Sequence, residues 1–190
     1  MMAMDFSKKV VFITGAASGI GAAQAQAFLT TGAYVFAFDQ QKQEMLTLQM
    51  NYPEQFAFFI GDVREKIALK KAIRKCHEHF GTVNILLNTV GVLDDYLPLH
   101  DTDEELWSNI LTTNLNSMFT LTKLLLPELL ENQGTVINMA SIAGLVAGGG
   151  GIAYTTSKHA IVGFTKQLAL DYAARGLHVN AIAPGAINTP

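Results

Sequence analysis

Short runs rich in valine, isoleucine and phenylalanine alternate along the chain with longer segments whose apolar residues recur at helical spacing. The short runs predict strands over 10–14, 34–39, 56–60, 85–89, 135–140 and 178–183. The longer segments predict helices over 20–30, 42–50, 65–80, 103–130 and 154–175. Apolar strands separated by helices are typical of a parallel sheet that is buried on both faces. The pattern therefore predicts an α/β fold with helices on both sides of one sheet.

Local signals mark the ends of these helices. Four glycines stand where a helix is expected to end in a left-handed residue: Gly32, Gly81, Gly134 and Gly176. Thr102 and Glu105 have the spacing of a capping box, so the acidic run around them indicates a helix start rather than a metal site. Pro127 is expected to kink or end the long fourth helix.

Composition narrows the class of protein. The 190 residues are 49% hydrophobic, which is enough for one domain with a continuous core over 1–190. No apolar run reaches the roughly 18 residues that cross a bilayer. The N-terminus also lacks a secretion signal, so we expect a cytoplasmic protein with no membrane partner. The net charge of −3 and the dispersed lysines argue against a nucleic-acid partner.

The chain has one cysteine, Cys76, which excludes an internal disulfide and a cysteine-based metal site. Its neighbours Arg74, Lys75 and His77 indicate that it lies on a solvent-facing helix. The five histidines are scattered, and His77 and His79 lie on different faces of that helix. We therefore predict no metal site.

Residues 14–21 read Thr-Gly-Ala-Ala-Ser-Gly-Ile-Gly and join the first strand to an alanine-rich helix. Gly15 allows the tight turn, Gly19 lets the backbone approach phosphates, and Gly21 lets the helix pack closely on the strand. The helix end adds free N–H groups and a partial positive charge, which suit a pyrophosphate. A plain strand-to-helix turn is the alternative interpretation.

Asp39 ends the second strand about twenty residues past the glycine turn, where a carboxylate accepts hydrogen bonds from the ribose hydroxyls of an adenosine. Its charge repels a 2′-phosphate. Neither the glycine turn nor Gln40 and Gln41 offers a cation for that phosphate, and Lys42 is the nearest exception. We therefore predict NAD in preference to NADP, although a cap or turn residue is the alternative interpretation of Asp39 by itself.

Tyr154 and Lys158 are four residues apart in a predicted helix, so their side chains share one face. A free phenol has a pKa of ~10, and a nearby ammonium favours the phenolate, which makes a tyrosine usable as a proton donor and acceptor. Isolated pairs with this spacing are common. Ser141 strengthens the interpretation because it follows the fifth strand, at the edge where parallel sheets bind ligands. Its hydroxyl can hold a substrate oxygen or cap a helix.

Further polar residues stand at the same end of the predicted sheet. Asn114 lies in an apolar helix face and must find polar partners. Asn88 closes the fourth strand, with Gly91 shortly after it, and Asp62 follows the third strand, where it can meet an adenine. A buried structural amide is the alternative for Asn114, and turn formation is the alternative for Asp62.

Together these residues resemble the short-chain dehydrogenase/reductase family over 9–190. Residues 14–21 resemble its Thr-Gly-x-x-x-Gly-x-Gly motif, and Pro184 and Gly185 with Thr189 resemble its motif after the sixth strand. Four residues resemble its catalytic tetrad: Asn114, Ser141, Tyr154 and Lys158. The resemblance, like the strand pattern, implies a Rossmann-type doubly wound parallel sheet in three αβα layers.

The resemblance also implies roles for the residues. Tyr154 acts as general acid/base, Ser141 polarises the carbonyl, and Lys158 binds the nicotinamide ribose and favours the phenolate. Asn114 supports a water-linked proton relay, while hydride passes directly between C4 of the nicotinamide and the carbinol carbon. The implied cofactor contacts are Gly15, Ser18, Gly19, Ile20, Gly21, Asp39, Asp62, Val63, Asn88, Gly91, Tyr154, Lys158, Pro184, Gly185, Ile187 and Thr189.

Two features depart from the family pattern. The family's Asn-Asn-Ala-Gly is Asn-Thr-Val-Gly at 88–91, where we expect the loop backbone to be kept. Family members continue through a substrate-covering segment, another helix and a seventh strand, so we expect these to be absent from the 190 residues.

These observations predict an NAD(H)-dependent oxidoreductase acting on a small-molecule ketone or secondary alcohol, with a pocket bordered by 93–99 and 145–151. A 3-oxoacyl-[acyl-carrier-protein] reductase using NADP(H) is the enzymatic alternative. Asp39 argues against it, as do Glu128 and Glu131, which are expected near the site and would repel an acidic carrier. An inactive dinucleotide-binding regulator is the alternative from another class, but it has no need of proton-transfer residues. The resemblance implies a homotetramer that uses the fourth and fifth helices as contact surfaces.

Overall fold

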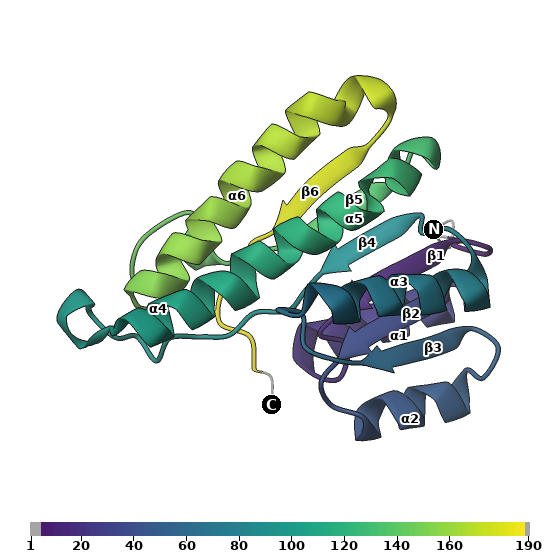
Figure 1. The fold of residues 1–190 in the computed structure, drawn as a ribbon, viewed down its shortest axis with the longest axis horizontal. Helices are drawn as coiled ribbons and strands as arrows, with labels where there is room; N and C mark the ends of the chain where they lie inside the picture. Colours follow the sequence, from purple (N-terminus) through teal and green to yellow (C-terminus); the bar gives the residue numbers. More distant parts are fainter. Residues whose placement is uncertain (1–4, 189–190) are drawn as a thin grey trace.

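The computed structural model describes residues 5–188, and its centre is one parallel sheet with the strand order β3-β2-β1-β4-β5-β6 (Figure 1). The strands are β1 (Val10–Thr14), β2 (Tyr34–Asp39), β3 (Phe56–Ile60), β4 (Ile85–Asn88), β5 (Thr135–Met139) and β6 (His178–Ile182). The longer helices are α1 (Gly19–Thr30), α2 (Gln43–Asn51), α3 (Lys66–Phe80), α4 (Glu104–Leu111), α5 (Ser117–Glu131) and α6 (Ile152–Tyr172). The chain builds outward from β1 to β3, then crosses back to β4 on the other side of β1, so the strand order reverses between β1 and β4.

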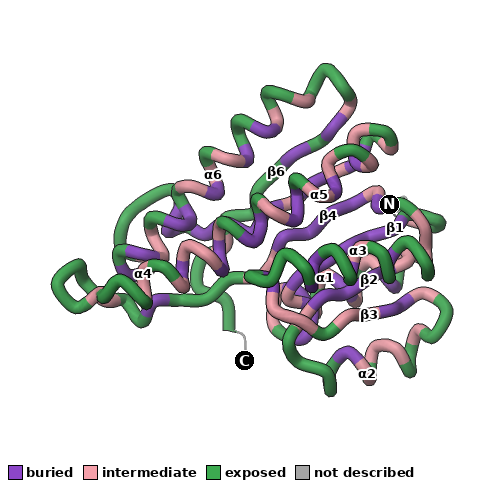
Figure 2. Tube along the Cα trace, viewed as in Figure 1, coloured by how far each residue is buried: buried purple, intermediate pink, exposed green. Residues whose placement is uncertain are grey.

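Successive strand residues pack on opposite faces of the sheet. Phe12 joins a buried cluster with Leu69 of α3 and Leu125 of α5, whereas its neighbour Ile13 joins a second cluster with Leu29 of α1. Figure 2 shows the buried strands β1, β2 and β4 lying between helices whose outer sides are exposed. At the edge of the sheet, β6 is mostly exposed and only Val179 is buried, so the prediction of a sheet buried on both faces was wrong for this strand. The predicted fold class, a doubly wound sheet in three αβα layers, is therefore confirmed.

The predicted fourth helix is divided in the structure. α4 ends at Leu111, a π-helical turn covers Thr112–Asn116, and α5 then continues past Pro127 to Glu131. Pro127 therefore does not end the helix, which was one of the two outcomes predicted for it, a kink being the other. The interruption occurs where the side chain of Asn114 hydrogen-bonds outside its own helix, and such wide turns are frequent at functional sites.

Three of the four predicted helix-ending glycines have the expected positive φ: Gly32, Gly81 and Gly176. The prediction was wrong for Gly134, because Gln133 takes the positive φ of 47° instead. Gly134 is needed for space, since a Cβ there would lie 2.5 Å from the carbonyl oxygen of Asn84. The backbone at Gly134 passes so close to Asn84, the residue before β4, that no side chain fits between them.

The residue that caps the start of α4 lies one position later than predicted. Asp103, rather than Thr102, caps the helix, and its Oδ1 accepts a hydrogen bond of 2.7 Å from the N–H of Leu106. The hydroxyl of Thr102 donates to the carbonyl oxygen of Pro98 instead. Aspartate is an equally good cap, so the acidic run does begin a helix.

The prediction of a solvent-facing Cys76 was wrong. Its side chain is buried together with Ala68, Leu69 and Ala72 on the inner stripe of α3. Burial raises the pKa of the Cys76 thiol, and the negative charge of Glu128 acts in the same direction. Because the thiolate is the reactive form, we expect this cysteine to be unreactive and to serve as a core residue.

Candidate active site

A cleft runs along the carboxyl ends of the strands. One part, of about 520 Å³, is lined by the glycine turn and by residues that follow β2, β3 and β4. A second part, of about 570 Å³, is lined by Ser141, Tyr154 and Lys158. Both parts share Ile20 and Gly91, so they adjoin. A ligand with two halves can therefore extend from the turn after β1 to the start of α6.

Nearly all the predicted cofactor contacts line one of these two parts. The first part includes Gly15, Ser18, Gly19, Ile20, Gly21, Asp39, Asp62, Val63 and Gly91. The second part includes Ile20, Gly91, Tyr154, Lys158, Pro184, Gly185 and Ile187. Asn88 lines neither part, and Thr189 lies outside the described residues.

The glycine turn has the geometry that a pyrophosphate needs. Gly15 has a φ of 75°, and a Cβ there would lie 3.1 Å from the side chain of Val90. A Cβ at Gly21 would collide with the carbonyl oxygen of Gly15, so α1 packs directly on the turn. The first N–H groups of α1 have no partner within the helix and open toward the cleft that Gly19 lines. These backbone features fit the phosphates of a dinucleotide.

Asp39 is held in place at the end of β2. Its Oδ2 accepts a hydrogen bond of 2.9 Å from the N–H of Ala17 in the glycine turn, and its Oδ1 accepts one of 3.0 Å from Gln41. A carboxylate has about four lone-pair sites, so both oxygens can still accept bonds from a ligand. The negative charge is thereby fixed at the edge of the cleft.

Arg64 is a residue of this cleft that the sequence analysis missed. Its guanidinium donates to both carboxylate oxygens of Asp62 and, at 2.7 Å, to Oδ1 of Asn109 on α4. The pairing with Arg64 holds the pKa of the Asp62 carboxyl below its ordinary value. The sequence signal was a basic residue in the loop after β3, since residues of this loop line the cleft together with residues of the loop after β2.

Tyr154 and Lys158 lie on the first two turns of α6. The ammonium of Lys158 is 5.4 Å from the centre of the Tyr154 ring and donates a hydrogen bond of 2.8 Å to the carbonyl oxygen of Met139. The Lys158 side chain is only 2% exposed, and burial lowers its pKa to about 8. Gly91 leaves room for it, since a Cβ there would lie 3.1 Å from Nζ.

Ser141 lines the same part of the cleft as Tyr154 and Lys158. It also caps the short turn Ile142–Gly144, where its Oγ accepts a hydrogen bond of 3.1 Å from the N–H of Ala143. The capping bond uses a lone pair and leaves the hydroxyl proton free to donate. Ser141 can therefore cap this turn and still donate a hydrogen bond to a substrate oxygen, the two uses that were predicted for it.

Asn114 lies behind the cleft and holds the loop that follows β4. Its Oδ1 accepts a hydrogen bond from the N–H of Val92 at 2.8 Å, and its Nδ2 donates to the carbonyl oxygen of Val92 at 2.9 Å. The same Nδ2 donates to Oγ of Ser157 at 3.2 Å, and that hydroxyl donates to the carbonyl oxygen of Tyr154. The buried amide thus has the polar partners that its apolar surroundings require.

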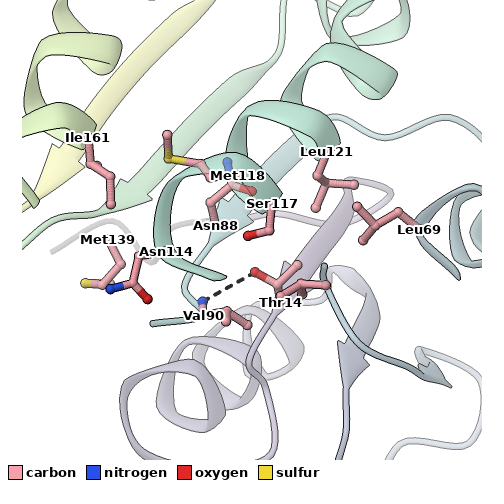
Figure 3. A pocket seen from close by; sticks show the side chains of 11 residues that line it. Thr14, Leu69, Asn88, Val90, Asn114, Ser117, Met118, Leu121, Met139 and Ile161 are labelled. Carbon is pink, nitrogen blue, oxygen red and sulfur yellow. Dashed lines mark hydrogen bonds between the residues drawn. The ribbon is translucent and has the colours of Figure 1, made fainter. Parts of the chain in front are cut away.

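Asn88 points into the core rather than into the cleft. Its Nδ2 donates to Thr122 of α5 and to Asn138 of β5, while its buried Oδ1 has no partner among the described residues. Figure 3 shows the amide beside an internal cavity of about 10 Å³, with Thr14 opposite. Room for about one water molecule therefore lies next to the unpaired oxygen.

The loop that departs from the family pattern is tied to the glycine turn. Oγ1 of Thr14 accepts hydrogen bonds from the N–H groups of Thr89 and Val90 (Figure 3 shows the second), and the hydroxyl of Thr89 donates to Gln24 of α1. Thr89, which stands where the family has asparagine, therefore has its own partner on α1.

Glu128 and Glu131 are not near the cleft, contrary to the prediction. Glu128 accepts a hydrogen bond of 2.7 Å from the N–H of Val83, just before β4 begins, and its carboxylate also contacts His77. α5 runs antiparallel to the strands, so its last turn lies at their amino ends. The charges of Glu128 and Glu131 are therefore no argument against the binding of an acidic carrier protein at the cleft.

The cleft has apolar walls where a substrate could enter. Leu93, Tyr96, Gly148 and Gly149 line it, and they fall within the two segments predicted to border the pocket. Lys158 is the one charged residue among the described residues of this part of the cleft. Across residues 5–188, no helix combines the length and apolarity needed to span a bilayer.

Comparisons with known proteins agree with this geometry. The model of the short chain dehydrogenase family matches residues 9–190. The 3beta-hydroxysteroid dehydrogenase 2 of Eggerthella lenta is 36% identical over 182 residues, which cover 93% of this chain and 70% of that protein. The 3-oxoacyl-[acyl-carrier-protein] reductase FabG of Thermotoga maritima is 32% identical over 191 aligned positions, with coverages of 98% and 77%.

A crystal structure with a similar fold comes from Caenorhabditis elegans. It is a short-chain dehydrogenase/reductase of unknown function solved with cofactor, and its TM-score is 0.89 at 26% sequence identity. The match covers 97% of this chain and 72% of the other.

Proposed function

This chain belongs to the short-chain dehydrogenase family of oxidoreductases, and from that premise we propose that it transfers a hydride between NAD(H) and a ketone or secondary alcohol, with Tyr154 as general acid/base. The observation that carries the proposal is the buried ammonium of Lys158, 5.4 Å from the Tyr154 ring, in the same part of the cleft as Ser141. A cation beside a phenol lowers the energy of the phenolate, so the hydroxyl can both donate and accept a proton.

The proposed roles follow from these positions. A bound NAD(H) supplies or accepts the hydride. During reduction, Tyr154 donates its hydroxyl proton to the substrate oxygen, which becomes an alcohol, and the phenolate is stabilised by the Lys158 ammonium. During oxidation, the same phenolate accepts the alcohol proton. Ser141 donates a hydrogen bond to the substrate oxygen, where negative charge develops. Asn114 acts indirectly, by holding the loop at Val92 and the first turns of α6.

We propose NAD rather than NADP because the charge of Asp39 is fixed at the adenosine end of the cleft. Arg64, the nearest cation lining that part of the cleft, is already paired with Asp62 and Asn109. Two like charges about 4 Å apart near a protein surface repel by up to about 4 kcal/mol at an effective dielectric of about 20. Even with screening, this repulsion disfavours a 2′-phosphate by about 100-fold.

The cofactor preference gives a direct prediction. The kcat/KM with NADH is expected to exceed that with NADPH by about 100-fold, and Asp39→Asn is expected to narrow the ratio at least about tenfold because the repulsion disappears. Steady-state kinetics with both cofactors measure the ratio. Glu44→Gln, which removes one exposed carboxylate from α2, serves as the control and is expected to leave the ratio unchanged. Equal use of both cofactors by the wild type contradicts the assignment.

The substrate is proposed to be an uncharged ketone or alcohol of modest size. Among the described residues that line this part of the cleft with Leu93, Tyr96 and Ile187, no cation is free to pair with a carboxylate or phosphate group, since Lys158 donates to Met139. A panel of neutral and acidic ketones and alcohols, assayed with NADH and NADPH, tests the proposal. Preference for acidic substrates contradicts it.

A 3-oxoacyl-[acyl-carrier-protein] reductase remains the second candidate, because the Thermotoga maritima relative of that name is 32% identical to this chain. The same panel should therefore include a carrier-linked 3-oxoacyl thioester. Its efficient reduction with NADPH establishes the second candidate. Dinucleotide binding without turnover of any substrate would instead indicate the inactive regulator.

We also propose a cytoplasmic homotetramer. Phe119 on α5 and Leu170 on α6 are apolar and exposed, at 48% and 75%, on helices expected to contact other subunits. Light scattering of the purified protein measures the subunit number, and a monomer contradicts this expectation.

A further inference from the structure

The loop after β4 contains a fully buried carboxylate, Asp94, which the sequence analysis did not single out. Its Oδ1 accepts a hydrogen bond of 2.8 Å from the N–H of Gly151, and its Oδ2 accepts one of 2.8 Å from the N–H of Tyr154. Gly151 precedes the first residue of α6, and Tyr154 is the third residue of the helix. A side chain from a distant loop therefore binds two of the N–H groups that a helix start leaves unpaired.

The surroundings of Asp94 are shaped for this contact. The N–H of Leu97 donates to the carbonyl oxygen of Asp94, and the carbonyl oxygen of Leu97 accepts a bond from the N–H of Ile152, both at 3.2 Å. A Cβ at Gly151 would lie 2.6 Å from Oδ2 of Asp94 and 2.6 Å from the backbone nitrogen of Leu97, so a side chain there would push the loop away from α6. The negative charge also lies at the positive end of the α6 dipole, where it is favourable.

The same loop is held at its other side by Asn114, through both backbone groups of Val92. Asn114 also binds Ser157, whose hydroxyl donates to the carbonyl oxygen of Tyr154. The backbone of Tyr154 is therefore attached at its N–H to Asp94 and at its carbonyl to a chain of bonds that returns to the same loop. Gly91, at the base of this loop, lines both parts of the cleft.

We propose that Asp94 is a positioning residue for Tyr154: it fixes the first turn of α6 to the loop that forms the floor of the cleft, so that the phenol keeps its place relative to bound ligands. The inference rests on the proposed role of Tyr154. It assigns to a buried carboxylate a function that needs neither substrate contact nor proton transfer. A displacement of about 1 Å at a reacting group can cost about 100-fold in rate, so the loss of this anchor should be visible in turnover.

Asp94→Asn tests the proposal, because the amide keeps one acceptor but turns an N–H group toward the other backbone N–H. We expect kcat to fall about 10- to 100-fold, while KM for the ketone and the dissociation constant for NADH change less than about twofold. Hydrogen exchange at the Tyr154 amide of the cofactor-free protein is expected to speed up about tenfold or more.

Asp95→Asn is the matched control. It removes the same charge one residue later, at an exposed position with a φ of 53° that asparagine tolerates. It is expected to change none of these quantities. If Asp94→Asn and Asp95→Asn have the same kcat and the same exchange rate at Tyr154, the proposal is overturned.

Gly151→Ala decides the question if Asp94→Asn does not fold. The added methyl would meet both the Asp94 carboxylate and the backbone nitrogen of Leu97, so it separates the loop from the first turn of α6 while keeping the charge of Asp94. The same fall in kcat is expected at a temperature where circular dichroism shows a folded protein, and an unchanged kcat overturns the proposal. Tyr154→Phe separates a failure of the proposed function from a failure of the proposed role of Asp94. If that variant keeps full turnover, the proposed function fails, whereas an inactive Tyr154→Phe beside a normal Asp94→Asn refutes only the role of Asp94.

Discussion

Tyr154→Phe is expected to lower kcat by about 100-fold or more, while the dissociation constant for NADH changes less than about twofold. The substitution removes the hydroxyl that donates the proton and keeps the ring beside the Lys158 ammonium. Since the backbone of Tyr154 is held by Asp94 and lies within a helix, phenylalanine can occupy the same position. Single-turnover kinetics and NADH fluorescence titration measure the two quantities separately.

Tyr96→Phe provides a matched control for that experiment. Tyr96 lines the same part of the cleft, but it is 61% exposed. Loss of its hydroxyl is expected to change kcat less than about threefold, because no proton transfer is assigned to it. Comparable turnover in Tyr154→Phe and the wild type would show that another group is the acid.

The strands could be predicted from the sequence because each is a short run rich in β-branched and other apolar residues, and the inner strands β1, β2 and β4 are buried on both faces. The predicted bounds of β1, β2 and β3 agree with the structure, and β4, β5 and β6 end one residue early, at Asn88, Met139 and Ile182. After these residues the chain leaves the hydrogen-bonded sheet, and the loops that follow line the cleft. The glycine turn could be predicted for the same reason, since the close approach of Gly21 to Gly15 is a local steric requirement.

The division of the fourth helix could not be predicted from local pattern. The π-helical turn coincides with a contact between Asn114 and Val92, 22 residues apart in the chain, and helical periodicity carries no signal of that contact. Asp94 was missed for a similar reason. Two aspartates stand side by side in the loop after β4, and only the fold decides that Asp94 is buried against α6 while Asp95 is exposed.

Cys76 is a different case, because the signal was present and was outweighed. Ala68, Ala72 and Cys76 recur at four-residue spacing, which is the pattern of a buried helix stripe. The charged neighbours on either side of Cys76 occupy other faces of the helix. Periodicity is therefore a better guide to burial within a helix than the residues adjacent in sequence.

Lys158→Met is expected to abolish turnover and, at neutral pH, to make the cofactor-free protein more stable by about 2 kcal/mol. Burial lowers the pKa of Lys158 from 10.5 to about 8, which corresponds to about 3 kcal/mol of cost for holding the charge in the folded protein. Methionine fills similar space without the charge, and loss of the hydrogen bond to Met139 offsets about 1 kcal/mol. Urea unfolding monitored by circular dichroism measures the difference, with the exposed Lys166→Met on the same helix as control.

The pH dependence of that difference identifies its cause. Below a pH of about 8, Lys158 is charged in both the folded and the unfolded chain, so the folded wild type carries the full cost. Between about 8 and 10.5 the unfolded chain binds the proton and the folded chain does not, so the wild type gains stability as pH rises. The advantage of Lys158→Met should therefore shrink across this window. An advantage that stays constant with pH, or a variant less stable than the wild type at neutral pH, would mean that the folded protein does not hold the ammonium at a cost.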